Sequence, residues 1–434
     1  MEGYPVLKDD IFFARIWADA KVEVKIRNTT TEKDFRPTSD TVLLLDLCNG
    51  TNTVKEISEE LSTQSGEPVE TLIKDINSIL EILQKKGIIA FVDTPLDCAL
   101  PPAIEVKRKY LTESAQIELT NTCNLLCLHC FNNSGESCPS ELTTQEILSL
   151  IDVLSSMGVH KITLTGGEPF LNPDLFKIVE YARKAPMTVT IFTNGTLITE
   201  DDIQKCKELA IKFAISVDSC NPDTHDRFRG QKGALHKTLH NINLLKNAGL
   251  PVRISVSLST MNKHEIIATL TYFNNHDLTD YQVAEVNISG RGRDEVVITP
   301  EEFYKVLVDQ LNFEKSLHTM NKRPPKPEGG CHIAQSLIYI KADGTILPCH
   351  ACHRDMGVGN VRDVDLPQLW DSNETLEMLR RIRAENDDVC KECPYIGYCD
   401  GCIGNAFISQ REYRCYDPYA CARFKAYDTL ELLE

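Results

Sequence analysis

Three closely spaced cysteines, Cys123, Cys127 and Cys130, are the residues of this chain best suited to hold a metal cluster. Their spacing is C-x₃-C-x₂-C, and a fourth cysteine is missing beside them. Iron–sulfur clusters of the four-iron type normally take four thiolates, so a site with three leaves one iron open to another ligand. Structural zinc sites need four closed ligands, usually from two short pairs. The spacing therefore favours an open four-iron cluster over a partial zinc site or three unrelated thiols.

A second group of cysteines lies near the end of the chain, after a Pro- and Gly-rich linker at 324–330. Its first two members flank residues 338–347, which predict a β-hairpin with an Asp-Gly turn. Later members form two C-x₂-C pairs, but the gap of five residues between the pairs is too short for the usual zinc ribbon. The group comprises Cys331, Cys349, Cys352, Cys390, Cys393, Cys399, Cys402, Cys415 and Cys421.

Polar residues and glycines follow several expected strands in the middle of the chain. Gly166 and Gly167 let the backbone approach a ligand closely, and the Glu168 carboxylate can accept a hydrogen bond from a ligand ammonium. The Arg229 guanidinium can bind a carboxylate through two hydrogen bonds. Each of these positions, taken alone, is also explained as a turn or a strand end. The other members of this set are Asn194, Ser216, Asp218, Ser255 and Ser257.

Alternating strands and amphipathic helices are expected to position these residues from about 112 to 320. The expected strands are 116–119, 161–165, 188–192, 211–217, 252–258 and 281–288, and the helices lie near 143–157, 173–185, 199–209, 233–248 and 263–275. Right-handed crossovers imply parallel strands, whose carboxyl ends carry the chemistry in α/β barrels. Six units fall short of eight, so we expect an α/β fold with an open, partial (β/α)₆ barrel.

The cysteine triad and the polar strand ends, in this order, resemble the radical S-adenosylmethionine (SAM) enzymes along the whole expected barrel. The resemblance implies that SAM chelates the open iron of a [4Fe-4S] cluster and that Glu168 holds the SAM amino group. His129 stands where the family usually has an aromatic residue, so its ring could stack on adenine or simply be exposed. SAM contacts are also implied for Gly166, Gly167, Asn194, Ser216, Asp218 and Arg229, with Ser255 and Ser257 lining the adenosine site.

The second cysteine group resembles the SPASM domain, which holds two auxiliary four-iron clusters, although its third gap has two residues rather than three. The resemblance implies a first cluster on Cys331, Cys349 and Cys402. It implies a second cluster on Cys390, Cys393, Cys399 and a later cysteine, Cys415 or Cys421, of which Cys415 is preferred because it lies nearer in sequence. The extra upstream cysteine of many relatives is missing, so Cys352 replaces it or the iron stays open for a substrate thiolate. The remaining cysteines, interpreted as ordinary thiols, are Cys48, Cys98, Cys138, Cys206 and Cys220.

Residues 1–95 predict a separate winged-helix-like domain with a strand at 22–27, three helices and a strand at 88–91. A DNA-binding module shares this layout, but the third helix is acidic. The apolar pattern resembles the PqqD-like domains of peptide-modifying enzymes, which add a leader peptide as a strand to a sheet edge. The resemblance implies that the 22–27 strand offers that edge and that Ile76, Leu80 and Leu83 supply side-chain pockets.

The composition limits the partners and the compartment. The chain has 434 residues and a net charge of −17, which disfavours nucleic acid and suits a basic peptide. Residues 1–10 contain no apolar signal segment, and no stretch approaches the roughly 18 apolar residues of a membrane span. We therefore expect a cytoplasmic protein with domains at 1–95, 112–320 and 321–434 and a linker at 96–111.

These features together predict a radical SAM oxidoreductase with three [4Fe-4S] clusters that modifies a ribosomally made precursor peptide. Its partners would be the leader-bearing peptide and an electron donor of the flavodoxin or ferredoxin type. The missing cysteine upstream of Cys331 favours a cysteine thioether as the product. The same parts also serve carbon–carbon cross-linking, epimerisation and formylglycine formation. A redox-sensing transcription factor is the alternative outside enzymes, but it does not need the Gly-Gly-Glu-Pro loop or the barrel.

Overall fold

The computed structural model describes residues 3–18, 21–96, 104–110, 112–317, 331–399 and 401–433. Cys98 and the expected linker at 324–330 lie outside these ranges. By its internal contacts the chain divides into two compact units. The first comprises residues 1–113 together with 148–161 and 180–188, and the second comprises 114–147, 162–179 and 189–434. Each unit is described separately.

The N-terminal part of the first unit is the winged-helix-like domain that the sequence predicts. Its helices are α1 (Ser39–Leu47), α2 (Val54–Ser65) and α3 (Val69–Lys85), followed by β5 (Ile89–Val92). A capping box starts α2: the Glu56 carboxylate accepts from the Thr53 N–H at 2.7 Å, and the Thr53 hydroxyl oxygen accepts from the Glu56 N–H at 3.2 Å. Such reciprocal capping fixes the start of the helix because it satisfies two otherwise unpaired backbone donors.

The strands of this domain are more numerous than the sequence pattern indicates. The expected strand is β3 (Lys21–Asn28), which pairs with β2 (Ile11–Ala18) in a four-stranded sheet of order β4-β3-β2-β6. The short strands β4 and β6 are Asp34–Phe35 and Ile104–Lys107, and β1 (Tyr4–Leu7) pairs with β5. Alternate residues of β2 belong to two different apolar clusters, so both of its faces are buried and its sequence does not alternate.

One prediction for this domain is wrong. Ile76, Leu80 and Leu83 of α3 do not offer pockets to a peptide, because all three are at most 3% exposed. They pack in the core of the domain with residues of α1, α2 and β5. The 3.6-residue stripe that identified the helix is therefore the stripe that holds the domain together. On the exposed side of α3, Ile82 remains 51% accessible.

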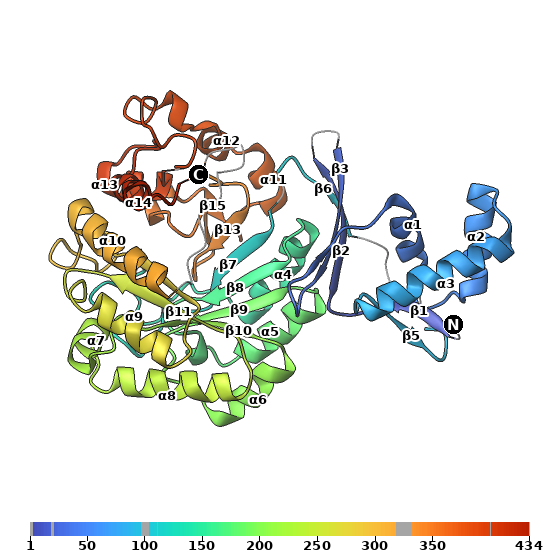
Figure 1. Ribbon diagram of the computed structural model, residues 1–434, viewed down its shortest axis with the longest axis horizontal. Helices are drawn as coiled ribbons and strands as arrows, with labels where there is room; N and C mark the ends of the chain where they lie inside the picture. Colours follow the sequence, from blue (N-terminus) through green and yellow to red (C-terminus); the bar gives the residue numbers. More distant parts are fainter. Residues whose placement is uncertain are drawn as a thin grey trace. The chain divides into compact units, whose positions relative to one another are not determined.

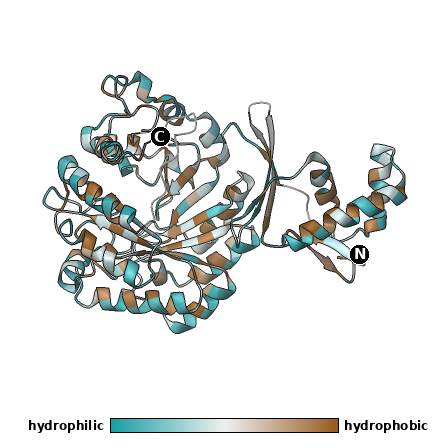
Figure 2. Ribbon diagram, in the orientation of Figure 1, coloured by the Kyte–Doolittle hydropathy of each residue, from teal (hydrophilic) through white to brown (hydrophobic). Residues whose placement is uncertain are grey.

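The sheet of the partial barrel has six strands in the order in which they occur along the chain (Figure 1). They are β7 (Ser114–Glu118), β8 (Lys161–Thr165), β9 (Thr188–Thr193), β10 (Lys212–Ser216), β11 (Val252–Leu258) and β12 (Tyr281–Glu285). The pairings from β9 to β12 are parallel, which confirms the expected α/β barrel. Many residues within these strands are apolar, while polar residues cover the outer turns of the helices (Figure 2).

Helices connect the strands close to where the sequence pattern places them. The predicted ones are α4 (Thr144–Ser156), α5 (Leu175–Lys184), α6 (Glu200–Glu208), α8 (Ala234–Asn247) and α9 (Ile266–Asn275), and two further helices are α7 (Pro222–Arg229) and α10 (Pro300–Ser316). Asn221 caps the short α7, and Gly230 ends it in the left-handed conformation at a φ of 73°. Because the helix ends at Gly230, Arg229 is its last residue and lies next to the cysteine loop.

The cysteine-rich region continues the barrel sheet instead of forming a separate one. Strand β13 (Leu337–Ile340) pairs in parallel with β7, and β14 (Thr345–Leu347) and β15 (Gly359–Asn360) extend the sheet. The predicted hairpin is confirmed, with Gly344 at a φ of 84° in its turn. The helices of this region are α11 (Leu366–Ser372), α12 (Glu374–Arg381), α13 (Ile403–Gln410) and α14 (Pro418–Thr429). Among the described residues, the helices lack the length and apolar character that a membrane crossing requires.

Candidate functional site

The loop with the three cysteines begins just past β7, and the loop after β8 lies directly against it. The N–H groups of Gly167 and Glu168 donate to the carbonyls of Thr120 and Thr122 at 2.7 and 2.9 Å. A Cβ on Gly167 would lie 2.2 Å from the Thr122 carbonyl oxygen, and one on Gly166 would lie 2.3 Å from the Thr120 carbonyl oxygen. Only glycine allows the two backbones to approach this closely, so Gly166 and Gly167 fix the start of the cysteine loop against the loop after β8.

Arg291 secures the other end of the loop, and the sequence analysis did not find it. Its N–H donates to the Cys130 carbonyl at 2.9 Å, and its guanidinium donates to the carbonyls of Cys127 and Ser134 at 2.8 and 2.5 Å. The preceding Gly290 has a φ of 56°, and a Cβ there would lie 2.2 Å from the Cys130 carbonyl oxygen. The available signal was the Gly-Arg-Gly-Arg stretch at 290–293, which follows the sixth strand.

Each of the three cysteine sulfurs accepts one hydrogen bond from the protein. The N–H of Leu125 donates to Cys123 Sγ at 3.5 Å, and the N–H of Ser134 donates to Cys130 Sγ at 3.3 Å. The Arg229 guanidinium donates to Cys127 Sγ at 3.8 Å. Burial raises the pKa of the Cys123 thiol to about 11. Three thiols with one donor each fit a four-iron cluster, since such bonds help to set the potential of its iron.

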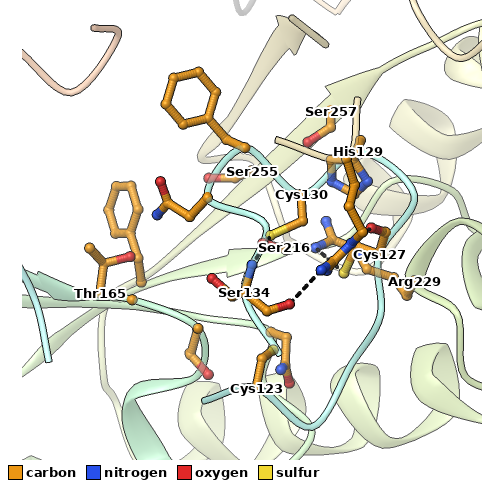
Figure 3. A pocket seen from close by; sticks show the side chains of 18 of the residues that line it. Cys123, Cys127, His129, Cys130, Ser134, Thr165, Ser216, Arg229, Ser255 and Ser257 are labelled. Atoms are coloured by element: carbon orange, nitrogen blue, oxygen red, sulfur yellow. Dashed lines mark hydrogen bonds between the residues drawn. The ribbon is translucent and has the colours of Figure 1, made fainter. Parts of the chain in front are cut away.

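A pocket of about 290 Å³ opens beside these sulfurs at the carboxyl ends of the strands (Figure 3). This volume lies near the lower end of the ~300–1,000 Å³ typical of small-molecule sites. The predicted residues that line it are Cys123, Cys127, His129, Cys130, Gly166, Gly167, Asn194, Ser216, Arg229, Ser255 and Ser257. Further lining residues are Phe131, Asn132, Ser134, Thr165, Phe192, Thr193, Ala214 and Arg291.

Glu168 lies behind the pocket wall, not on its surface. Its carboxylate accepts from the Thr193 hydroxyl at 2.7 Å and from the Asn194 N–H at 2.9 Å, and the side chain is fully buried. Burial raises the pKa of this carboxyl to about 7. Glu168 therefore joins the loops after β8 and β9 and places the backbone of Gly166, Gly167 and Asn194 around the pocket.

Asp218 is also buried, and it orients Arg229. The Arg229 Nε donates to Asp218 at 2.6 Å, and the Ser257 N–H donates to the other carboxylate oxygen at 2.9 Å. Burial by itself would raise the pKa of Asp218, but the guanidinium brings it below its usual value. The pair therefore stays charged and directs one Arg229 nitrogen toward Cys127 and the pocket.

His129 lines the pocket with one ring face already covered. Its ring stacks on Phe228 with centroids 4.0 Å apart and an angle of 12° between the planes. Burial lowers the pKa of His129 to about 3, so the imidazole is neutral. Among the described residues, its buried Nδ1 has no hydrogen-bond partner. The ring is available as an apolar wall or as a neutral hydrogen-bonding group for a bound ligand.

Three cysteines of the C-terminal region belong to or pack against one apolar cluster, and the thiol of a fourth, Cys402, lies near them. Cys352 is fully buried there, and Cys331 and Cys349 pack against the same cluster. Burial and then the thiols of Cys349, Cys402 and Cys331 raise the pKa of Cys352 well above its usual value. Cys402 also accepts a hydrogen bond from the Asn405 N–H at 3.5 Å. The arrangement brings four thiols together, the number that a four-iron cluster normally takes.

Five further cysteines line a small cavity of about 20 Å³: Cys390, Cys393, Cys399, Cys415 and Cys421. After burial, the thiols of Cys399 and Cys393 raise the pKa of Cys421 to about 11. The thiol that most strongly raises the pKa of Cys415 is Cys331, which belongs to the other group. The thiols that influence Cys421 all belong to the second group, those that influence Cys415 include Cys399 as well as Cys331, and both Cys415 and Cys421 raise the pKa of Cys390.

These sulfurs do not converge on a single point. In the described ranges, no three or more His, Cys, Asp or Glu side chains are arranged to hold a single metal ion. In a four-iron cluster each thiolate binds a different iron, so convergence on one centre is not what the cluster needs. Of the other cysteines, Cys48 and Cys206 are buried, and Cys138 and Cys220 are half-buried.

Comparison with known proteins agrees with this geometry. The radical SAM superfamily profile matches residues 117–273, the SPASM iron–sulfur cluster-binding domain 331–394, and coenzyme PQQ synthesis protein D (PqqD) 41–89. An AdoMet-dependent heme synthase of Methanosarcina barkeri is 30% identical over 70% of this chain and 95% of its own. The subtilosin biosynthesis protein AlbA of Bacillus subtilis is 28% identical over 69% of each chain. The structure of Streptococcus suis SuiB bound to precursor peptide SuiA superposes with a TM-score of 0.66 at 14% identity, covering 95% of this chain and 99% of that one.

The chain therefore belongs to the radical SAM superfamily, and it is an enzyme. More narrowly, it combines the radical SAM match with SPASM and PqqD matches, and its relatives include the subtilosin and sporulation killing factor maturation proteins of Bacillus subtilis. Its cofactors are SAM and [4Fe-4S] clusters, one that binds SAM and two auxiliary ones.

Proposed function

We propose that this enzyme forms a thioether between a cysteine and a carbon atom of a ribosomally made precursor peptide whose leader binds to residues 1–95. The observation that carries the proposal is the pocket beside Cys123, Cys127 and Cys130, in a chain that also has a PqqD-like domain. The domain limits of the sequence analysis, 1–95, 112–320 and 321–434, belong to this proposal. A flavodoxin or ferredoxin in the cytoplasm would supply electrons.

Different residues of the pocket would bind different parts of SAM and its cluster. Cys123, Cys127 and Cys130 would bind the cluster, and the Gly166–Gly167 backbone and Arg229 offer acceptors and a donor to the charged end of SAM. Ser216, Ser255 and Ser257 offer hydroxyls to the remaining polar atoms. When bound and reduced, the cluster and SAM supply a 5′-deoxyadenosyl radical that removes a hydrogen atom from the peptide. The protein supplies orientation and keeps water away.

We assign the first auxiliary cluster to Cys331, Cys349, Cys352 and Cys402, and the second to Cys390, Cys393, Cys399 and Cys421. This replaces the preference for Cys415 as a ligand of the second cluster. Nine thiols serve eight ligand positions, and Cys415 is the one left over. With Cys352 in place, the substrate cysteine needs no iron site. A cluster held by these cysteines would supply an acceptor for the one electron that is released, together with one proton, when the substrate S–H and the carbon radical join in a C–S bond.

The leader has a suitable groove in the N-terminal domain. A cavity of about 390 Å³ lies between the β3–β4 hairpin and the end of α3. Its lining combines apolar residues with three lysines, and Lys86 Nζ lies 4.8 Å from the centre of the Phe35 ring. Strand β4 pairs only with Ile26 and Arg27 of β3, so within the described residues the backbone from Lys21 to Lys25 is an open edge on that side. A leader with acidic and apolar side chains fits this groove, despite the net charge of the chain.

A charge reversal tests the groove. Lys33→Glu combined with Lys86→Glu should reduce modification of the precursor peptide at least tenfold, while SAM cleavage without peptide stays at the parent rate. Lys55→Glu, on the exposed side of α2 beside Glu59, is the matched control and should change neither rate. Unchanged peptide modification in the double variant would remove the leader from this groove.

Mass spectrometry tests the bond. The cognate precursor peptide should lose two hydrogens per thioether, and the joined cysteine should resist alkylation by iodoacetamide. Loss of two hydrogens with every thiol still alkylated would mean a carbon–carbon bond. Deuterium gained from heavy water without another mass change would mean epimerisation. An aldehyde at a former cysteine or serine would mean formylglycine formation.

A tetrapyrrole is the second candidate substrate, because the heme synthase of Methanosarcina barkeri is 30% identical over 95% of its length. That alignment leaves 30% of this chain unmatched, and a porphyrin gives no role to the PqqD-like domain. Incubation with iron coproporphyrin, SAM and dithionite separates the two candidates. SAM-dependent loss of mass from the porphyrin, with the precursor peptide unchanged, would support the heme-type reaction.

A further inference from the structure

A closed ring of hydrogen bonds, the bonds to Glu118 buried and those to Asn132 partly buried, lies at the base of the cysteine loop. Glu118, at the end of β7, accepts from the Tyr339 hydroxyl at 2.5 Å and from Lys341 Nζ at 2.9 Å on one oxygen. Its other oxygen accepts from the Ala342 N–H at 3.1 Å. Lys341 also donates to the Asn132 side-chain carbonyl at 3.0 Å, and the Asn132 amide donates to the Tyr339 hydroxyl oxygen at 3.2 Å.

The ring joins three segments that are distant in sequence. Glu118 precedes Cys123, Asn132 follows Cys130 and lines the SAM pocket, and Tyr339 and Lys341 come from the SPASM hairpin. The ring therefore encloses the cysteine loop at both of its ends and attaches it to a strand of the neighbouring domain. Glu118, Tyr339 and Lys341 are each less than 10% exposed, so the bonds to Glu118 are shielded from water, whereas Asn132 is half-buried at the pocket wall.

Tyr339 also reaches the first auxiliary site. Its ring belongs to the apolar cluster that contains Cys352 and that Cys331 and Cys349 pack against. The Tyr339 hydroxyl donates to Glu118 at the other end of the same side chain. One side chain connects the hydrogen-bonded base of the SAM-cluster loop with the packing around the first auxiliary cluster.

We propose that Tyr339 is a positioning residue that couples the SAM-binding cluster to the first auxiliary cluster, acting through Glu118, Lys341 and Asn132. A buried carboxylate and ammonium are tolerated only while their hydrogen-bond partners are in place, so loss of one partner changes the field around the others. Charges and hydrogen bonds near the sulfurs set cluster potentials. The hydroxyl of Tyr339 therefore influences the potential of the SAM cluster from the side of the SPASM domain.

Tyr339→Phe removes only that hydroxyl. In the reconstituted full-length enzyme we expect wild-type iron content and an altered electron paramagnetic resonance spectrum of the reduced SAM cluster. In a potentiometric titration without SAM or peptide, the ratio of reduced to oxidised cluster at fixed potential should change about three- to tenfold, as loss of a buried hydrogen bond would cause. Tyr281→Phe is the control, because it removes a tyrosine–glutamate bond to Glu314, 3.1 Å long, at the far end of β12.

A double-mutant cycle keeps the proposal testable if a single variant assembles poorly. Asn132→Ala removes the opposite side of the ring, and its effect on the SAM-cluster titration should not add to that of Tyr339→Phe, because both act through one network. Strictly additive shifts would overturn the proposal. A Tyr339→Phe enzyme whose titration and spectrum match those of the wild type and of Tyr281→Phe would overturn it as well. Neither readout depends on which peptide the enzyme modifies.

Discussion

The two cysteine-bearing regions of this enzyme differ in what surrounds their sulfurs. Cys123, Cys127 and Cys130 border a pocket of about 290 Å³ with glycines, hydroxyls and a guanidinium in its wall. The C-terminal cysteines lie in an apolar cluster or around a cavity of about 20 Å³. The first region has fewer thiols than a four-iron cluster takes, and the second has enough for two clusters with one to spare. The first region therefore offers space beside its thiols to a bound molecule, whereas the thiols of the second are packed against apolar side chains or around a much smaller cavity.

The largest effect should come from removing the open site. Replacement of Cys123, Cys127 and Cys130 together by alanine should abolish SAM cleavage and remove about a third of the iron, roughly 4 of 12 atoms for three clusters. Iron analysis and chromatography of 5′-deoxyadenosine measure the two quantities. The auxiliary clusters should keep their spectra, because their ligands lie in separate packing environments. Continued 5′-deoxyadenosine formation in this variant would contradict the assignment of the catalytic site.

Single substitutions of Cys415 and Cys421 should show which of the two is a ligand of the second auxiliary cluster. Cys421→Ala should cost up to about 4 iron atoms, whereas Cys415→Ala should leave the iron content and the spectrum unchanged. The two cysteines line the same cavity, so each variant is the control for the other. If Cys415→Ala loses the cluster and Cys421→Ala keeps it, the ligand assignment of the second auxiliary cluster is reversed.

Removing one ligand of the first auxiliary cluster should change the enzyme less than either loss of a whole cluster. Cys352→Ala should leave the first auxiliary cluster with three thiolates and one exchangeable iron, which Mössbauer spectroscopy would resolve as a distinct site. SAM cleavage without peptide should continue, because the SAM pocket is unchanged. Added thiols such as dithiothreitol should then alter the spectrum of the variant and not that of the wild type. A wild-type cluster that already responds to thiols would show that the first auxiliary site is open.

The sequence predicted those features that depend on local patterns. Strands β8 and β11 have the expected limits, since apolar and polar residues alternate along each of them. The hairpin before Cys349 followed from its Asp-Gly turn. The cysteines could be grouped because ligand spacing is itself a sequence pattern.

Features that depend on contacts between distant segments were not predictable. The burial of both faces of β2, the addition of β13 to the barrel sheet and the grip of Arg291 on the cysteine loop all arise from tertiary packing. The sequence identified Glu168 as a polar strand end, but it could not show that the carboxylate turns toward Thr193 and Asn194. Nor could it show which of Cys352, Cys415 and Cys421 lie beside the other ligands.

The smallest expected effect concerns the carboxyl group behind the open pocket. Burial raises the pKa of Glu168 to about 7, above an ordinary value of 4.5. The folded state therefore binds the Glu168 proton more tightly than the unfolded state does. Its contribution to stability is fully present below about pH 4.5 and is lost as the pH rises through 7.

Between pH 6 and 8 the wild-type enzyme without SAM should lose about 1 kcal/mol of unfolding free energy that Glu168→Gln does not lose. Urea unfolding followed by circular dichroism at the two pH values measures this difference, with the exposed Glu59→Gln as control. Equal pH dependence in all three proteins would mean that Glu168 is already ionised at pH 6 and that its wall of the pocket is more polar than its buried position indicates.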